Sequence, residues 1–279
     1  MTTATTSSAL GGLTALPPAS GRAGFGGALR SEWTKIRSVR STMWTLGSAV
    51  VVTIGISVLG NWGRANHSGA NAARLAQEDL TQRTLFGIIL GQLIMVVFGA
   101  MAITSEYSTG MVRTSLTAQP RRAPVFAAKL LVVSFVAFVI GEVISFVSFL
   151  ISSSFWRSKG ISLSLSSPHA MQAVIGGGLY LAGSAILAFG LGAILRHTAG
   201  AITSGVGLLF VVTILANFLP DNWQQHLDKW LPFNSGGQVW ATQHVPGNDL
   251  SAWTGFGVFM IYGAVAVLLG AYVFRNRDA

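Results

Sequence analysis

The chain has 279 residues, of which 51% are hydrophobic and only 10% are charged, whereas soluble domains carry about 25% charged residues. This composition excludes a chain that is disordered throughout, and the absence of cysteine excludes a disulfide scaffold, thiolate catalysis and Cys-ligated metals. A formal net charge of +9 is compatible with nucleic-acid binding, but the positions of the charges indicate a membrane instead.

Residues 1–28 are rich in Thr, Ser, Ala, Gly and Pro and contain a single arginine, Arg22. They lack the charged start and apolar core of a secretory signal. We therefore expect a disordered cytoplasmic tail over residues 1–28, followed by one membrane domain over residues 29–279.

The segment that leads into the first apolar run has one apolar stripe, formed at i, i+4, i+7 spacing by Leu29, Trp33, Ile36 and Met43. Basic side chains fall outside this stripe. The pattern predicts an amphipathic interfacial helix that lies flat on the inner leaflet. Such a helix either only anchors the chain and sets its topology, or also contacts a cytoplasmic partner. Its candidate contact residues are Arg30, Trp33, Lys35, Ile36 and Arg37.

Six long runs nearly free of charge follow, and each is long enough to cross about 30 Å of hydrocarbon as a helix. The alternating ten-residue pattern of a membrane barrel does not occur. Buried helices of a large soluble core are the alternative, but so few charged helix faces disfavour it. We therefore predict an all-α polytopic membrane helix bundle, with an N-terminal interfacial helix and a Ser-rich loop over 160–169. The six transmembrane helices are expected over 42–60, 84–104, 130–151, 171–195, 200–219 and 253–274.

All eight Trp residues lie at or near the ends of these runs or between them, as in the aromatic belt at a membrane interface. Trp44, Trp62, Trp156 and Trp253 mark ends of runs, and the other four lie in connecting segments.

Six spans place both termini on one side of the membrane, and two thirds of the 18 Lys and Arg residues fall on that side. The positive-inside rule therefore predicts a multi-pass protein of the plasma (inner) membrane with both termini in the cytoplasm. Anionic lipid headgroups then account for most of the basic charge without nucleic acid.

The second connection, residues 105–129, is the longest segment on the cytoplasmic side. Glu106, near its start, either caps a helix dipole or contacts a partner. Leu116 belongs to a short amphipathic stretch that Pro120 ends. Arg121 and Arg122 either set topology and contact lipid, or contact a partner.

Glu142 is the only charged residue deep within a predicted span. A carboxylate at the centre of a helix costs roughly 2.5–3.5 kcal/mol on insertion scales, so it should face protein or water. It can make a structural hydrogen bond, line a substrate path or pair with a cationic substrate, or couple transport to protons. Small residues such as Gly87 and Gly91 indicate close helix packing, within the chain or at a subunit interface.

No catalytic motif is present in the sequence. A phosphate-binding loop needs GxxxxGK[ST], and none of the four Lys residues follows a Gly. The five His residues include no HExxH pair, none lies within a predicted span, and no two share the spacing of ligands on one helix face. We assign no catalytic, cofactor-binding or metal-binding residue and expect no enzyme activity.

The whole pattern resembles the membrane subunits of ABC-2 type ABC exporters over about residues 28–275. These subunits have six spans, cytoplasmic termini, an amphipathic first helix and a coupling segment between spans two and three. The resemblance rests on the coupling-segment residues Glu106, Gly110, Leu116, Pro120, Arg121, Arg122 and Lys129. The stretch from Arg30 to Ser38 resembles actinobacterial members especially, and the step before span six at residues 231–232 is similar to a recurrent family feature. One departure is that the segment begins Glu-Tyr-Ser-Thr, without the more highly charged cluster common in the family.

The resemblance implies a permease subunit that forms the translocation pathway with a second permease subunit, as a homodimer or a heterodimer. A separate ATP-binding cassette subunit would bind ATP and Mg²⁺. The implied partner-coupling residues are Glu106, Gly110, Arg113, Leu116, Pro120, Arg121 and Arg122. The alternative function is an ATPase-independent secondary carrier or channel that uses Glu142. An intramembrane enzyme is disfavoured because the predicted spans contain no central His or Cys.

Overall fold

The computed structural model describes residues 24–67, 78–108, 122–243 and 250–276. These residues contain no strand, and six of their helices are long and apolar enough to cross a membrane. The chain is therefore an all-α, multi-pass membrane helix bundle, which confirms the fold class predicted from the sequence.

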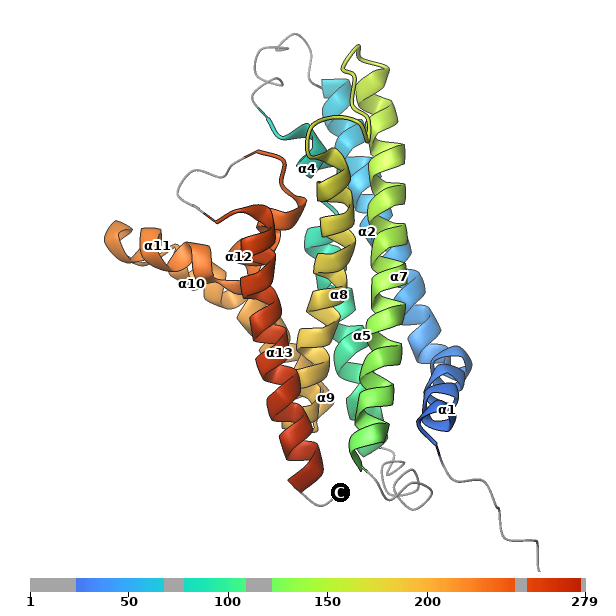
Figure 1. Ribbon diagram of the computed structural model, residues 1–279. Coiled ribbons are helices and arrows are strands. Elements are labelled where there is room, and N and C mark those ends of the chain that lie inside the picture. The colour runs from blue at the N-terminus through green and yellow to red at the C-terminus, as the bar shows by residue number, and fades with distance from the viewer. Residues whose placement is uncertain (1–23, 68–77, 109–121, 244–249, 277–279) are drawn as a thin grey trace, which may run out of the picture.

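Five long helices cross the bundle side by side, and shorter helices connect them or lie at their ends (Figure 1). The long helices are α2 (Arg40–His67), α5 (Ile88–Ser108), α7 (Arg122–Arg157), α8 (Ala170–Leu195) and α13 (Ala252–Asn276). The shorter helices are α1 (Phe25–Ser38), α4 (Leu80–Thr84), α9 (Thr198–Val206), α10 (Val212–Ala216), α11 (Asp221–Leu227) and α12 (Pro232–Gly237). The α1 helix lies at the end of the bundle where α13 also ends (Figure 1), and we call this the α1 end.

Helix α8 forms the centre of the bundle and packs against α5, α7 and α13. Its glycines, and those of its neighbours, bring backbones into direct contact. A Cβ atom added at Gly99 of α5 would lie 2.0 Å from the carbonyl oxygen of Ala185 in α8. Small residues drive this packing because lipid gives no hydrophobic reason for two membrane helices to associate.

Gly87 and Gly91 also serve internal packing. They lie against Thr53 of α2, whose carbonyl oxygen would be 2.0 Å from a Cβ atom at Gly87. Of the two interpretations of these small residues, the structure therefore favours packing within the chain.

The helices begin and end at different residues from those expected. Helix α1 begins at Phe25, within the segment predicted to be a disordered tail, and ends before Val39. Met43 therefore belongs to α2 and not to the stripe of the first helix. Helix α7 begins before the predicted span 130–151, because Lys129 lies inside the helix with its charge paired. At its other end α7 continues beyond residue 151, to Arg157.

The fifth candidate span, Thr198–Ala216, is built from three pieces. Helix α9 packs on α8 and α5, a π-helical segment follows at Gly207–Val211, and α10 continues from it. Helices α10 and α11 project sideways from the other helices (Figure 1). The π-helical segment marks the change between the packed and projecting parts, in keeping with the frequent association of such segments with bends.

Two Trp residues do not belong to the predicted interfacial belt. Trp156 and Trp240 are only 0% and 5% exposed, whereas the other six Trp side chains are exposed. The Nε1 atom of Trp156 donates a hydrogen bond to Oδ1 of Asn61, 2.8 Å away. The belt prediction was wrong for Trp156 because its polar group has a partner inside the bundle.

Candidate functional site: a charge cluster at the α1 end

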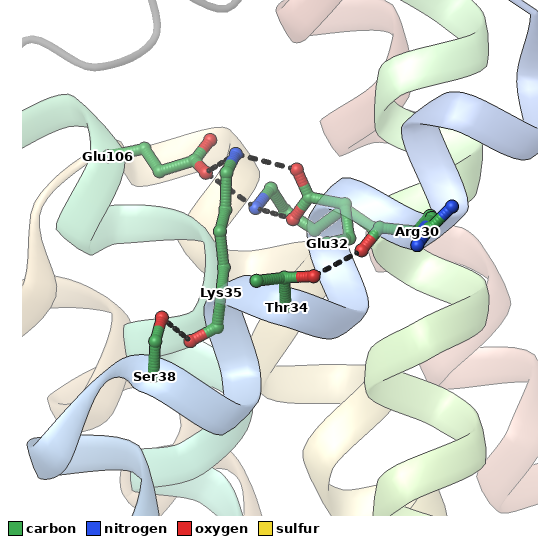
Figure 2. Close-up of polar contacts among 7 residues, drawn as sticks. Arg30, Glu32, Thr34, Lys35, Ser38 and Glu106 are labelled. Carbon is green, nitrogen blue, oxygen red and sulfur yellow. Dashed lines mark hydrogen bonds and ion pairs between the residues drawn. The ribbon is translucent and has the colours of Figure 1, made fainter.

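Four charged side chains from three helices meet at the α1 end, and we call them the charge cluster. They are Glu32 and Lys35 of α1 and Glu106 of α5, which Figure 2 labels, together with Lys129 of α7. The Nζ atom of Lys35 is 2.7 Å from a carboxylate oxygen of Glu32 and 2.7 Å from one of Glu106. The Nζ atom of Lys129 is 2.8 Å from the same Glu106 oxygen and also contacts Glu32. Each lysine therefore bridges both carboxylates.

The helical periodicity of α1 explains why Glu32 points into the bundle. It follows Leu29 by three residues and precedes Ile36 by four, and residues at these spacings share one face of a helix. Leu29 and Ile36 both pack against the buried core. Lys35, three residues after Glu32, reaches the cluster from the same side.

The cluster is buried and electrically balanced. The side chains of Glu32, Glu106 and Lys129 are 6%, 10% and 7% exposed, and that of Lys35 is 26% exposed. Two carboxylates face two ammonium groups, so no charge is left unpaired away from water, which would be strongly destabilising. Charge-assisted hydrogen bonds of this length are among the stronger ones in proteins.

Lys35 stays charged because of these contacts. Burial alone would lower the pKa of its ammonium group, but the hydrogen bonds and negative charges of Glu106 and Glu32 outweigh burial. The pKa of Lys35 is therefore raised above its ordinary value of 10.5.

Other contacts fasten the same end of α5. The hydroxyl of Thr198, at the start of α9, donates to the Thr104 hydroxyl at 2.8 Å. The ring of Tyr107 lies 6.5 Å from that of Phe274 in α13, with the Arg196 guanidinium 5.2 Å from its centre. The last turn of α5 is thus held by α1, α7, α9 and α13 together.

The structure places only part of the predicted coupling segment. Glu106 lies in the last turn of α5, the negative end of the helix dipole. Its interpretation as a cap at a positive helix end was therefore wrong, and Lys35 and Lys129 balance its charge instead. Arg122 is the first residue of α7. The remaining predicted coupling residues lie outside the described residues: Gly110, Arg113, Leu116, Pro120 and Arg121.

The predicted interfacial helix forms, but it packs more closely on the bundle than expected. Arg30 and Arg37 are exposed, as the amphipathic pattern predicts. The ring of Trp33 lies 6.3 Å from that of Phe135 in α7, and Ile36 is partly buried. Lys35 was expected on the water-facing side, but it turns toward the cluster because two carboxylates lie there.

Sequence reasoning did not select Glu32 as a site residue, and it included Lys129 only through the family resemblance. For Glu32 a signal existed, since this acidic residue shares a helix face with Leu29 and Ile36. No local signal connects Lys129 with a residue 97 positions earlier in the chain.

Glu142 lies apart from the cluster, in the middle of α7 against α8. A Cβ atom added at Gly178 would be 2.5 Å from its carboxyl carbon, so only glycine allows this approach. Both carboxylate oxygens are buried, and neither has a hydrogen-bond partner among the residues described. The structural hydrogen bond considered for Glu142 is therefore not formed with that part of the chain.

The six spanning helices and the charge cluster at one end define a polytopic, all-helical membrane protein. The chain belongs to the family described as a protein of unknown function (DUF2705), whose family model matches residues 40–279. The match begins with α2, so it includes Glu106 and Lys129 but not Glu32 and Lys35. No curated protein matches the chain.

Proposed function

We propose that the chain is the membrane-spanning permease subunit of an ATP-driven exporter of the ABC-2 type. It lies in the plasma (inner) membrane with both termini in the cytoplasm and pairs with a second permease subunit. A separate ATP-binding cassette subunit binds ATP and Mg²⁺ and contacts the α1 end.

The charge cluster is the observation that carries this proposal. It joins α1 to α5 and α7 through Glu32, Lys35, Glu106 and Lys129. Helices α5 and α7 contain the two ends of residues 105–129, the expected coupling segment. A partner that moves this segment therefore acts on both helices and, through the cluster, on the amphipathic helix as well.

Such coupling needs two arrangements of the bundle and a partner that binds them with different affinity. The ATP-bound and ATP-free forms of the partner subunit provide that difference. The exposed basic residues Arg30 and Arg37 of α1 offer a contact surface at the same end.

The test is to solubilise the chain gently from membranes and identify the chains that co-purify. A partner with a phosphate-binding loop, and ATP hydrolysis that copies of this chain stimulate, are the expected results. Arg30→Ala and Arg37→Ala should weaken this association at least tenfold. Lys159→Ala is the matched control, because Lys159 is also exposed and basic but follows α7 at the opposite end. If no ATPase co-purifies, or if Lys159→Ala weakens association equally, the proposal fails.

The second candidate function is a secondary carrier or channel that uses Glu142. The buried carboxylate oxygens without a partner among the described residues favour it, since intramembrane carboxylates often mark ion and proton pathways. ATP-depleted vesicles with an imposed proton gradient distinguish the two functions. Under this candidate they retain transport, and Glu142→Gln abolishes it.

A further inference from the structure

A second buried polar feature joins α2 and α7, and we call it the hydroxyl seam. It consists of Thr53, Ser57 and Asn61 in α2, and of Ser148, Ser152 and Trp156 in α7. Within each helix the three residues follow one another at intervals of four, so they form a stripe along one side. All six are buried.

The two stripes lie in register. Helices α2 and α7 are neighbours and run in the same direction (Figure 1). The Trp156 ring donates to Asn61, and 95 positions separate these two residues. The same separation relates Ser152 to Ser57 and Ser148 to Thr53. Since each step of four residues rises about 6 Å along both helices, the three pairs occupy matching depths.

Neighbouring helices close the seam on the α2 side. The Ser57 hydroxyl accepts a hydrogen bond from the backbone N–H of Gly87 at 2.9 Å. The Asn61 side-chain amide donates to the carbonyl oxygens of Ser57 and Arg83, at 2.7 and 2.9 Å. The Thr53 side chain lies against Gly91 of α5.

Three hydroxyl groups in the seam are nonetheless unpaired. The side-chain oxygens of Thr53, Ser148 and Ser152 are buried and have no hydrogen-bond partner among the described residues. Helix geometry does not force this outcome, because Ser153 and Ser154 donate to carbonyl oxygens of the preceding turn. Lipid supplies no donor or acceptor, so a buried hydroxyl needs a partner from protein or water.

We propose that the hydroxyl seam binds a short row of water molecules between α2 and α7. Water is the ligand whose chemistry fits. A hydroxyl both donates and accepts, as water does, and none of the six side chains carries a charge that would select an ion. Ordered water typically satisfies buried polar groups that lack a protein partner. The seam is therefore a hydrated interface inside the bundle, whatever the protein transports.

The experiment is X-ray radiolytic footprinting of the full chain in lipid nanodiscs. Radiolysis forms hydroxyl radicals from water in place, and these oxidise adjacent side chains such as Trp156, which is itself 0% exposed. We expect oxidation of Trp156 to fall at least fivefold when the unpaired hydroxyls are removed together in a Thr53→Val, Ser148→Ala, Ser152→Ala variant. Ser154→Ala is the matched control, because its hydroxyl is on the exposed side of α7, and it should change nothing. An equal rate in the native chain and the triple variant overturns the proposal.

Two further measurements control for misfolding of the variants and test the proposal independently. Trp240 is buried outside the seam, so an unchanged rate there shows that the triple variant is folded. If that rate rises, Ser148→Ala and Ser152→Ala are compared singly, with the same expectation for Trp156. Thermal unfolding gives an independent result. Removing a hydroxyl that is buried dry should raise the unfolding midpoint, so a rise in Ser148→Ala and Ser152→Ala also overturns the proposal.

Discussion

Replacing Lys129 with Met tests the charge cluster most directly. The change removes one of two buried cations and leaves Glu32 and Glu106 to share Lys35. Removing one partner of a buried ion pair typically costs 3–5 kcal/mol. Because Lys35 remains 2.7 Å from both carboxylates, we expect the lower end of this range, about 3 kcal/mol, or roughly a 100-fold change in the unfolding equilibrium.

The assay is equilibrium unfolding in mixed detergent micelles, followed by Trp fluorescence. A double variant, Lys129→Met with Glu106→Gln, restores the balance of one carboxylate to one ammonium group. Neutral replacement of a whole buried pair is often close to neutral for stability, so the double variant should regain about 2 kcal/mol relative to the single variant. Arg37→Met is the control on α1, and its exposed side chain should leave unfolding unchanged.

The result that refutes the reasoning is additivity. If the double variant is less stable than Lys129→Met by the full effect of Glu106→Gln alone, the two charges do not interact in the folded protein. A loss of stability in Arg37→Met equal to that in Lys129→Met would show that any lysine or arginine at this end has the same effect, and the cluster would have no special role.

Three further predictions concern packing, a helix cap and pH. Gly99→Ala should destabilise the bundle by about 1–3 kcal/mol through overpacking, because the new Cβ atom would lie 2.0 Å from a carbonyl oxygen of α8. Gly55→Ala is the control: a Cβ atom there would have no neighbour within 4 Å, so the same unfolding assay should show no loss of stability. Asp79→Asn should weaken the contacts that this carboxylate makes with the first turn of α4 and with the backbone near residue 242. We expect the backbone amide hydrogen of residue 242 to exchange with solvent at least tenfold faster in this variant. The pKa of Lys35 is raised, so its contribution to stability should be complete below pH 10.5 and disappear as the pH rises through the raised pKa. When the free energy of unfolding is measured against pH, Lys35→Met should therefore not show this loss of stability at alkaline pH.

The six spans follow from the sequence because a helix that crosses a bilayer needs a long run of apolar residues, and such runs are visible without any knowledge of tertiary contacts. Their ends were less predictable. We began the third span after Lys129 because an unpaired cation does not belong in hydrocarbon. In the folded chain Glu32 and Glu106 neutralise it, so the helix continues past it.

The charge cluster shows the limit of reasoning from local pattern. Glu106 was selected, but as a helix cap or a partner contact, because its neighbours in sequence include no cation with which it pairs. Its partners Lys35 and Lys129 are 71 and 23 positions away, and only packing brings them together. Trp156 illustrates the same limit, since Trp residues at the ends of apolar runs are usually interfacial, and its partner Asn61 is 95 positions away.

The way the four charges are divided among the helices has a consequence for how α1 can move. Glu32 and Lys35 belong to the same short helix and contact each other, while Glu106 and Lys129 remain as a second pair 2.8 Å apart. If α1 lifts away from the bundle, each surface keeps its own counterion, and no net charge is separated. Release of this helix therefore breaks the Lys35–Glu106 and Lys129–Glu32 contacts without separating net charge. These contacts and the apolar packing of α1 on the bundle together decide how tightly it is held.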